Sequence, residues 1–213
     1  MKRSPWLVAL VAGVLLAGVV AGPAGAAGPN LLGDSSFEKP KVTEGSGVHS
    51  ISGPSVVLGH CTSPGNTIKC WRTTGDVDIV RSSVWQPKAG LQSVQLHTGA
   101  GVGSVFQEVY SPTPGSARLT FYLSANPAAT DNLGVEIRIA SYDGGGAEIP
   151  GTAVVQDYSY FDPSHTAANM KYVKESLVYP MASTDVRFGV QAIGFLGDPT
   201  IGPVIDKFSF KLL

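Results

Sequence analysis

The chain has 213 residues, of which 15% are charged and 43% hydrophobic, and its formal net charge is −1. That charged fraction is well below the roughly 25% of an average soluble domain, which argues against a chain kept disordered by its charge. A net charge this close to zero gives no basic footprint for nucleic acid. The 26 Gly and 15 Pro residues favour short strands and many turns over long helices.

The first 26 residues have the pattern of a secretory signal peptide. Lys2 and Arg3 form a positive start, residues 6–20 are almost purely apolar, and Ala24-Gly25-Ala26 matches the small-residue cleavage pattern. The apolar run is short for a membrane span, and no stop-transfer charges follow it. We therefore expect cleavage after Ala26 and export of a mature chain, residues 27–213, without a membrane span.

Export changes the interpretation of the two cysteines, Cys61 and Cys70, because the compartment is oxidising. A turn at Pro64-Gly65-Asn66 could bring them within bridging distance. The alternative is a metal or redox pair, but two cysteines without nearby histidines make a poor zinc site, and the spacing is not C-x-x-C. We predict a Cys61–Cys70 disulfide. It would constrain the end of the irregular stretch 42–70, which we interpret as a long surface loop.

Past residue 30 the hydrophobic side chains mostly alternate with polar ones, which is the period of a half-buried strand. In chain order, the expected strands are residues 93–97, 104–109, 118–123, 134–139, 171–178, 186–193 and 204–212. Glu136 and Arg138 would lie on one strand face. Many short strands separated by turn signals predict an all-β fold, a jelly-roll β-sandwich. We expect one domain, because no long linker or repeat divides residues 27–213.

Three segments, taken together, resemble a known family. They are NLLGDSSFE at residues 30–38, WRTTGDVDIV with GLQSVQL at 71–80 and 90–96, and GPVIDKFSF at 202–210. The set resembles the secreted bacterial choice-of-anchor C type domain and is similar to a related plant cell-wall domain family of unknown function. The resemblance runs from residue 30 to residue 213 and implies a jelly roll of the galactose-binding-domain type, a fold shared with many carbohydrate-binding modules.

The chain departs from that family at two places. Gly33-Asp34-Ser35 stands where the family has Asn-Gly, and Cys70 stands where a glycine often precedes the tryptophan. Trp71 matches the family tryptophan and is expected in the core. The resemblance therefore supports the fold better than it supports a ligand, because one fold hosts many functions.

A secreted hydrolase is the main competing interpretation. The chain has no G-x-S-x-G elbow and no H-E-x-x-H motif, and its four histidines fall in loops, in a turn or at a strand end. Asp76 and Asp78, two residues apart, would share a strand face at a spacing within the glycosidase range. The alternative is that Asp76 lies in a turn and Asp78 at a solvated strand position, and we expect a non-catalytic protein.

Carboxylates near the two ends of the mature chain suggest a metal site. In jelly rolls of this type the first and last strands commonly lie antiparallel, so Glu38, expected to end the first strand, would meet Asp206 at the start of the last. Asp34 could add a further ligand, and calcium takes six to eight oxygens. The resemblance to carbohydrate-binding modules thus implies a structural calcium, while the alternative is a surface pair or Asp206 accepting backbone N–H groups.

Sugar binding needs an aromatic platform and polar groups for the hydroxyls. Trp85 lies in a loop-like stretch, and Tyr158 and Tyr160 belong to the densest aromatic cluster and would share one face of a strand. We predict these three as ligand-binding residues, with ordinary packing as the alternative for each. The other aromatic candidates that we considered are Trp71, Tyr110, Tyr122, Tyr142 and Phe161.

These observations predict a secreted protein, extracellular or associated with the cell wall, that binds a polysaccharide or cell-envelope glycan without catalysis. Nucleic acid is not an expected partner. Two other interpretations stay open: a glycan-active hydrolase or lyase, and a structural or adhesive surface protein.

Overall fold

A computed structural model describes residues 28–53, 56–57, 71–98, 101–110, 115–143, 147–181, 187–196 and 200–213. The predicted signal peptide, residues 1–26, and the predicted disulfide, Cys61–Cys70, lie outside the described residues. The stretch 42–70, predicted as an irregular surface loop, is described at 42–53 and 56–57 only, where it contains two short strands that the prediction did not include. Within the described ranges, no helix is long and apolar enough to cross a membrane.

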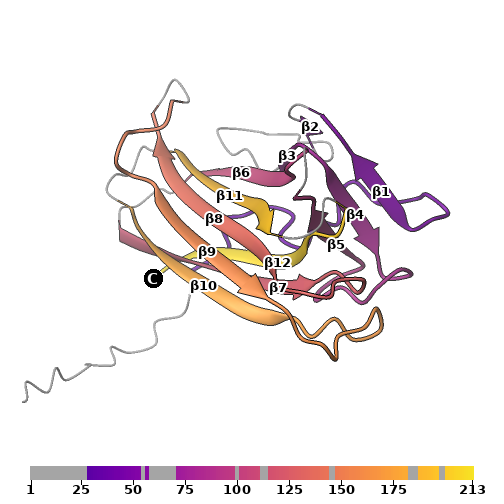
Figure 1. Ribbon diagram of the computed structural model, residues 1–213. Helices are drawn as coiled ribbons and strands as arrows, with labels where there is room; N and C mark the ends of the chain where they lie inside the picture. Colours follow the sequence, from indigo (N-terminus) through magenta and orange to yellow (C-terminus); the bar gives the residue numbers. More distant parts are fainter. Residues whose placement is uncertain are drawn as a thin grey trace, which may run out of the picture.

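The described chain forms two six-stranded antiparallel sheets (Figure 1). Sheet A has the order β1-β4-β5-β12-β7-β10, with β1 (Val48–Ile51), β4 (Val77–Arg81), β5 (Gln92–Leu96), β12 (Pro203–Leu212), β7 (Gly115–Ala125) and β10 (Val173–Met181). Sheet B has the order β2-β3-β6-β11-β8-β9, with β2 (Val56–Val57), β3 (Arg72–Thr74), β6 (Ser104–Tyr110), β11 (Arg187–Leu196), β8 (Leu133–Tyr142) and β9 (Val154–Tyr160). The predicted all-β jelly-roll sandwich is confirmed.

Alternation of side chains explains why these strands form two layers. In β7, Leu119, Phe121 and Leu123 are fully buried, whereas Thr120 and Tyr122 between them point away from the core. The predicted strand at 171–178 starts too early, because Lys171 has a φ of 53° and cannot belong to an extended strand. The other six predicted strands lie within, or one residue beyond, β5 to β8, β11 and β12.

The segment that ends at Glu38, where we expected the first strand to end, is not a strand. Asp34 and Phe37 have positive φ angles of 43° and 55°, which interrupt an extended backbone. The segment still runs beside β12, as the adjacency prediction requires: Leu31 N–H donates to the Phe210 carbonyl at 2.8 Å, and Phe208 N–H to the Ser35 carbonyl at 2.7 Å. The prediction that this segment lies beside the last strand is confirmed. The prediction that the segment is itself a strand is wrong.

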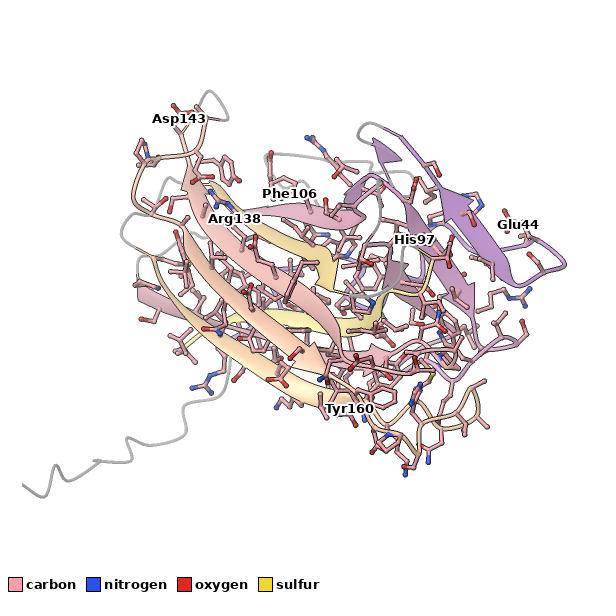
Figure 2. All side chains as sticks on the ribbon, viewed as in Figure 1. Glu44, His97, Phe106, Arg138, Asp143 and Tyr160 are labelled. Atoms are coloured by element: carbon pink, nitrogen blue, oxygen red, sulfur yellow. The ribbon has the colours of Figure 1, made fainter. Side chains whose placement is uncertain are left out.

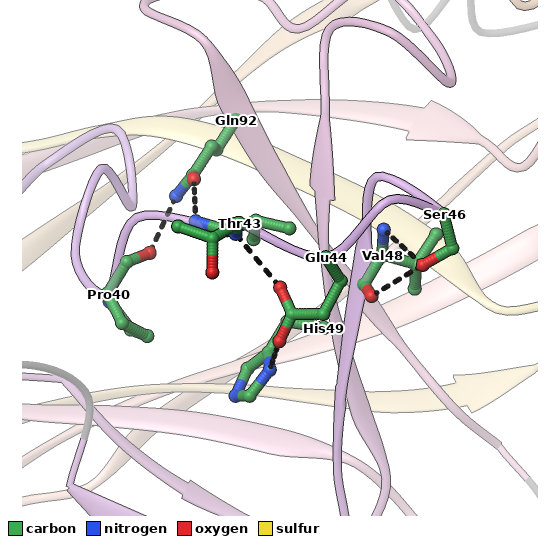
Figure 3. A network of polar contacts seen from close by, with 8 residues as sticks. Pro40, Thr43, Glu44, Ser46, Val48, His49 and Gln92 are labelled. Carbon is green, nitrogen blue, oxygen red and sulfur yellow. Dashed lines mark hydrogen bonds and ion pairs between the residues drawn. The ribbon is translucent and has the colours of Figure 1, made fainter.

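Two buried glutamines satisfy backbone groups of this segment in place of a strand ladder. Gln107 accepts the Gly33 N–H at 2.8 Å and donates to the Gly33 carbonyl at 3.1 Å. Gln92 accepts the Val42 N–H and donates to the Pro40 carbonyl (Figure 3). It donates to the Phe37 carbonyl as well. Side chains of β5 and β6 therefore fasten the N-terminal segment to the sandwich.

The three family-like segments meet in the core through their aromatic side chains. The Phe37 and Trp71 ring centroids are 4.9 Å apart, and each ring lies edge-on to Phe208, at 5.7 and 5.3 Å. Phe208 also stacks on Phe121 at 5.3 Å. Trp71 is 1% exposed and donates from Nε1 to the Asp34 carbonyl, so the expectation that it is a core residue is confirmed.

Candidate functional site

Trp85, predicted as a sugar-binding platform, is only 7% exposed. Its Nε1 donates to Ser93 Oγ at 2.8 Å, and its ring packs with Val80, Met170 and Val204 on the outer face of sheet A. The loop-like sequence around it therefore does not leave it exposed. Trp85 does line an open pocket of about 390 Å³ between residues 82–87 and residues 167–168.

Tyr158 and Tyr160 share one face of β9, as predicted, but that face turns toward the core. Tyr158 lies edge-on to Phe121 with centroids 5.2 Å apart, and its hydroxyl donates to the Ser176 carbonyl of β10 at 3.0 Å. Burial raises the pKa of both tyrosines. Tyr158 thus links the edge strands of the two sheets, and sugar binding by either ring stays a prediction.

Glu38 and Asp206 converge on one turn, residues 88–92, as the metal prediction requires. Glu38 Oε1 accepts the N–H groups of Leu91 and Gln92 at 2.8 and 3.2 Å. Asp206 is 0% exposed and accepts the N–H groups of Ala89 at 2.9 Å and Lys207 at 2.6 Å. Burial raises the pKa of Asp206 to about 7, and the charge of Glu38 adds to the rise.

These carboxylates are placed as acceptors for backbone N–H groups rather than as calcium ligands. Both oxygens of Asp34 accept N–H groups as well, from Glu38 at 2.8 Å and Lys39 at 2.9 Å. Across the described ranges, no group of three or more His, Cys, Asp or Glu side chains is placed to hold a metal ion. The donor set does not fit calcium, which prefers six to eight oxygens free to bind it.

Asp78, half of the carboxylate pair considered for catalysis, is bonded to a histidine. Its Oδ2 lies 2.9 Å from His97 Nε2, and the two side chains are 16% and 17% exposed. The His97 N–H donates to the Asp76 carbonyl at 3.1 Å. Asp78 of β4 therefore has a close partner in His97, one residue beyond the end of β5.

An aromatic pair lies on the outer face of sheet B, where the sequence did not lead us to expect a site. In β6, Val105 and Val109 face the core, so Phe106 and Glu108 face outward. Phe106 and Tyr142 of β8 meet edge-on, with centroids 6.0 Å apart. The positions between these strands are small, because Glu108 pairs with Gly189 of β11, and Gly189 pairs with Ala140 of β8.

An ion pair is fixed beside the two rings. Arg138 Nη2 lies 2.5 Å from both carboxylate oxygens of Glu148, and this bond raises the pKa of Arg138. Burial raises the pKa of Tyr142, and the charge of Glu148 adds to the rise. Glu148 and Tyr142 also form an isolated antiparallel β-bridge through their backbones. The same backbone pairing therefore positions both the ion pair and the Tyr142 ring. Figure 2 shows Phe106 and Arg138 near one another on this sheet.

We define the sheet B face by its outward side chains: Arg72, Phe106, Glu108, Glu136, Arg138, Tyr142 and Glu148. Strand parity, the alternation of side chains between the two faces of a strand, could have identified it. Phe106 and Glu108 alternate with the core-facing Val105 and Val109. Aromatic and charged side chains held in fixed positions on a solvated sheet suit the recognition of a polar ligand that has apolar faces.

Residues 30–211 match the family described as "Protein of unknown function (DUF642)". The chain belongs to the DUF642 family. The match covers nearly the same span as the resemblance seen in the sequence, and membership of the choice-of-anchor C type stays a prediction. A comparison of this DUF642 chain with curated proteins finds no match.

Solved structures with a similar arrangement of strands include three carbohydrate-binding modules. TmCBM61 in complex with β-1,4-galactotriose is 20% identical, with 86% of this chain and 99% of that chain covered and a TM-score of 0.47. The xylan-binding CBM22-1 of Paenibacillus barcinonensis Xyn10C is 16% identical, covering 76% and 97%, at 0.43. The C-terminal family 22 module of Clostridium thermocellum Xyn10B is 15% identical, covering 70% and 87%, at 0.46. These values do not transfer a binding residue to the DUF642 chain.

Proposed function

We propose that this DUF642 protein binds a polysaccharide or cell-envelope glycan through the sheet B face, without catalysis. The observation that carries the proposal is the Phe106–Tyr142 ring pair beside the fixed Arg138–Glu148 ion pair. Aromatic rings stack on the C–H faces of sugars, and charged groups bond strongly to sugar hydroxyls. Together they can hold a sugar ring by its face and by its edge.

Rigidity of these groups favours binding. Both rings sit on central strands of a packed sheet, and Glu148 holds the guanidinium of Arg138 in one position. A side chain that is ordered before the ligand arrives loses less conformational entropy on binding. The sheet B face is thus prepared for its ligand by the fold.

The proposal places the protein outside the cell, because residues 1–26 have the pattern of a cleaved signal peptide. The proposal does not require calcium, because Glu38, Asp34 and Asp206 do not belong to the sheet B face. The disulfide Cys61–Cys70 remains part of the proposal as an expected consequence of export.

The test is binding of purified residues 27–213 to a panel of neutral polysaccharides. Phe106→Ala and Tyr142→Ala should each weaken binding at least tenfold, while Leu91→Ala, at a 59% exposed residue of the turn 88–92, leaves it unchanged. Circular dichroism and melting temperature check that each variant is folded. Unchanged affinity in both aromatic variants would reject this site, and release of reducing sugar would move the protein to the enzyme class, with Asp76 and Asp78 mutated first.

The pocket at Trp85 is the competing location for the glycan. Ala168→Trp would fill this pocket of about 390 Å³ without removing the buried Trp85 ring. If the sheet B face is the site, this variant binds as tightly as the unchanged chain. Loss of binding in Ala168→Trp with full binding in Phe106→Ala would move the site to the pocket.

A further inference from the structure

The last three strands of sheet A are β12, β7 and β10 (Figure 1). The outer face over these strands is basic. Strand parity points Arg118, Thr120 and Tyr122 of β7 away from the core. On β12, Lys211 pairs with Arg118 and Ser209 with Thr120. On β10, Lys174 pairs with Tyr122 and Ser176 with Thr120. Cationic and hydroxyl side chains therefore share one surface.

Two lysines gather over the Tyr122 ring. Lys88 Nζ lies 4.6 Å from the ring centroid, and Lys207 Nζ lies 5.6 Å from it. A tyrosine ring attracts ammonium groups through its negative face. Tyr122 thus holds two positive charges close together, with exposed Lys174 in register on the neighbouring strand.

Arg118 and Lys211 are directly opposite one another on neighbouring strands. Like charges in this position destabilise a sheet. The ion pairs found among the described residues are His49–Glu44, His97–Asp78 and Arg138–Glu148, and none of them neutralises this surface. Asp206, which pairs with Tyr122 in the sheet, is fully buried and accepts two N–H groups. Among the described residues, no carboxylate forms an ion pair with Arg118 or Lys211, so both can contact a bound anion.

We define the sheet A basic face by five cationic residues, with the hydroxyl groups between them: Lys88, Arg118, Lys174, Lys207 and Lys211, with Thr120, Ser176 and Ser209. Their concentration is local, because the whole chain has a formal net charge of −1. The other sheet's outer face instead carries charges of both signs, with Glu108, Glu136 and Glu148 beside Arg72 and Arg138. The two outer faces therefore suit ligands of different charge.

We propose that the sheet A basic face is a second binding site, for a polysaccharide that carries carboxylate or sulfate groups. The lysines and Arg118 would contact the anionic groups, and the hydroxyl side chains would bond to the sugar hydroxyls. This inference takes glycan as the ligand class from the proposed function but uses different residues. Nucleic acid is disfavoured as the occupant, because ammonium groups cover the ring face on which a base would stack.

The test is affinity electrophoresis of residues 27–213 in gels containing polygalacturonate, dextran sulfate or neutral galactan, with a gel without polysaccharide as reference. In the variant Lys88→Glu/Lys174→Glu, the affinity for polygalacturonate measured from the retardation should fall at least tenfold. The matched control, Lys39→Glu/Lys41→Glu, makes the same charge change at two exposed lysines outside the face and should keep it. Retardation should weaken with added salt, because exposed charges are screened.

The outcomes separate this site from the sheet B face. Phe106→Ala should lose galactan and keep polygalacturonate, and Lys88→Glu/Lys174→Glu should do the reverse. Dextran sulfate retarded without polygalacturonate would show that sulfate is the anion, within the same site. Equal loss in both double variants, no retardation by either anionic polymer, or tighter binding of single-stranded DNA or anionic lipid vesicles would overturn the inference. If the unchanged chain binds no polysaccharide at all, the proposed function fails as well.

Discussion

The outer faces of the two sheets are built by the same alternation of side chains and carry opposite chemistry. The sheet B face joins the Phe106–Tyr142 ring pair to Arg138 and acidic side chains, whereas the sheet A basic face places lysines around a single ring, Tyr122. On sheet B the cation Arg138 has a carboxylate partner, Glu148. On sheet A, Arg118 faces another cation, Lys211.

This difference teaches that the core and the two faces are nearly independent features of the chain. Many inward positions on both sheets are apolar and fully buried, as in Leu119 and Ile137, so packing fixes them. Outward positions such as Arg118 and Glu136 are exposed or half-buried, so packing restricts their charge much less. A variant of the core should therefore disturb both faces together, and a variant of one face should leave the other intact.

The largest expected effect comes from a variant in the aromatic cluster of the core, which lies between the two sheets and supports both outer faces. Phe208→Ala should lower the free energy of unfolding by about 3–5 kcal/mol, because Phe208 packs against Phe37, Trp71 and Phe121. Urea denaturation measures the loss. Val178→Ala, at a 48% exposed side chain of β10, is the control and should change stability by less than about 0.5 kcal/mol. A loss below about 1 kcal/mol in Phe208→Ala would contradict this packing.

The second effect concerns Asp206, which lies below the sheet A basic face. Its pKa is about 7 in the folded chain and 3.8 as an ordinary aspartate, so folding takes up a proton between these values. Stability should therefore fall as the pH rises from 3.8 to about 7, by about 1.4 kcal/mol per pH unit from this residue. Between about pH 5 and about pH 6.5, this is a loss of about 2 kcal/mol.

Asp206→Asn supplies the comparison, because an amide does not titrate in this range. The stability difference between the unchanged chain and this variant should shift by about 2 kcal/mol over that pH interval, whatever the variant's own stability. Urea denaturation at several pH values gives the slope. Parallel pH profiles for the two proteins would show that Asp206 is ionised in the folded chain.

The sequence predicted most of the fold because strand parity is a local signal. It failed at residues 30–38, where the positive φ angles at Asp34 and Phe37 and the bonds to Gln92 and Gln107 decide the conformation. Those bonds join residues 55 to 74 positions apart in the chain, so no local pattern reports them. The family resemblance was more informative there, because its three segments meet at Phe37, Trp71 and Phe208.

The candidate site was harder to predict than the fold. Trp85 lies in a stretch typical of an exposed loop, but Met170, far along the chain, packs against it. Tyr158 was correctly placed on a shared face with Tyr160, yet only the sandwich shows that this face turns inward. Phe106 was overlooked because a phenylalanine in a strand is usually core, and its partner Tyr142 is 36 positions away.

The third effect would test what the ion pair contributes to the sheet B face. Glu148→Gln removes the charge that fixes Arg138 and should weaken glycan binding about three- to tenfold, because the guanidinium must then be ordered by the ligand. Isothermal titration calorimetry measures the affinity. Retardation by polygalacturonate through the sheet A basic face should not weaken. An unchanged glycan affinity would mean that Arg138 takes no part in binding.

The smallest effect would decide the role of Tyr158, which the sequence predicts as a sugar platform and the fold uses as a link between sheet edges. Tyr158→Phe keeps the ring against Phe121 and removes only the hydroxyl that donates to the Ser176 carbonyl. The free energy of unfolding should fall by about 0.5–1.5 kcal/mol, the usual net value of one hydrogen bond. Glycan affinity should stay unchanged on both faces, because the ring faces the core. A loss of affinity without a loss of stability would return Tyr158 to the binding site, and the sheet edge between β9 and β10 would then join the sheet B face as a ligand surface.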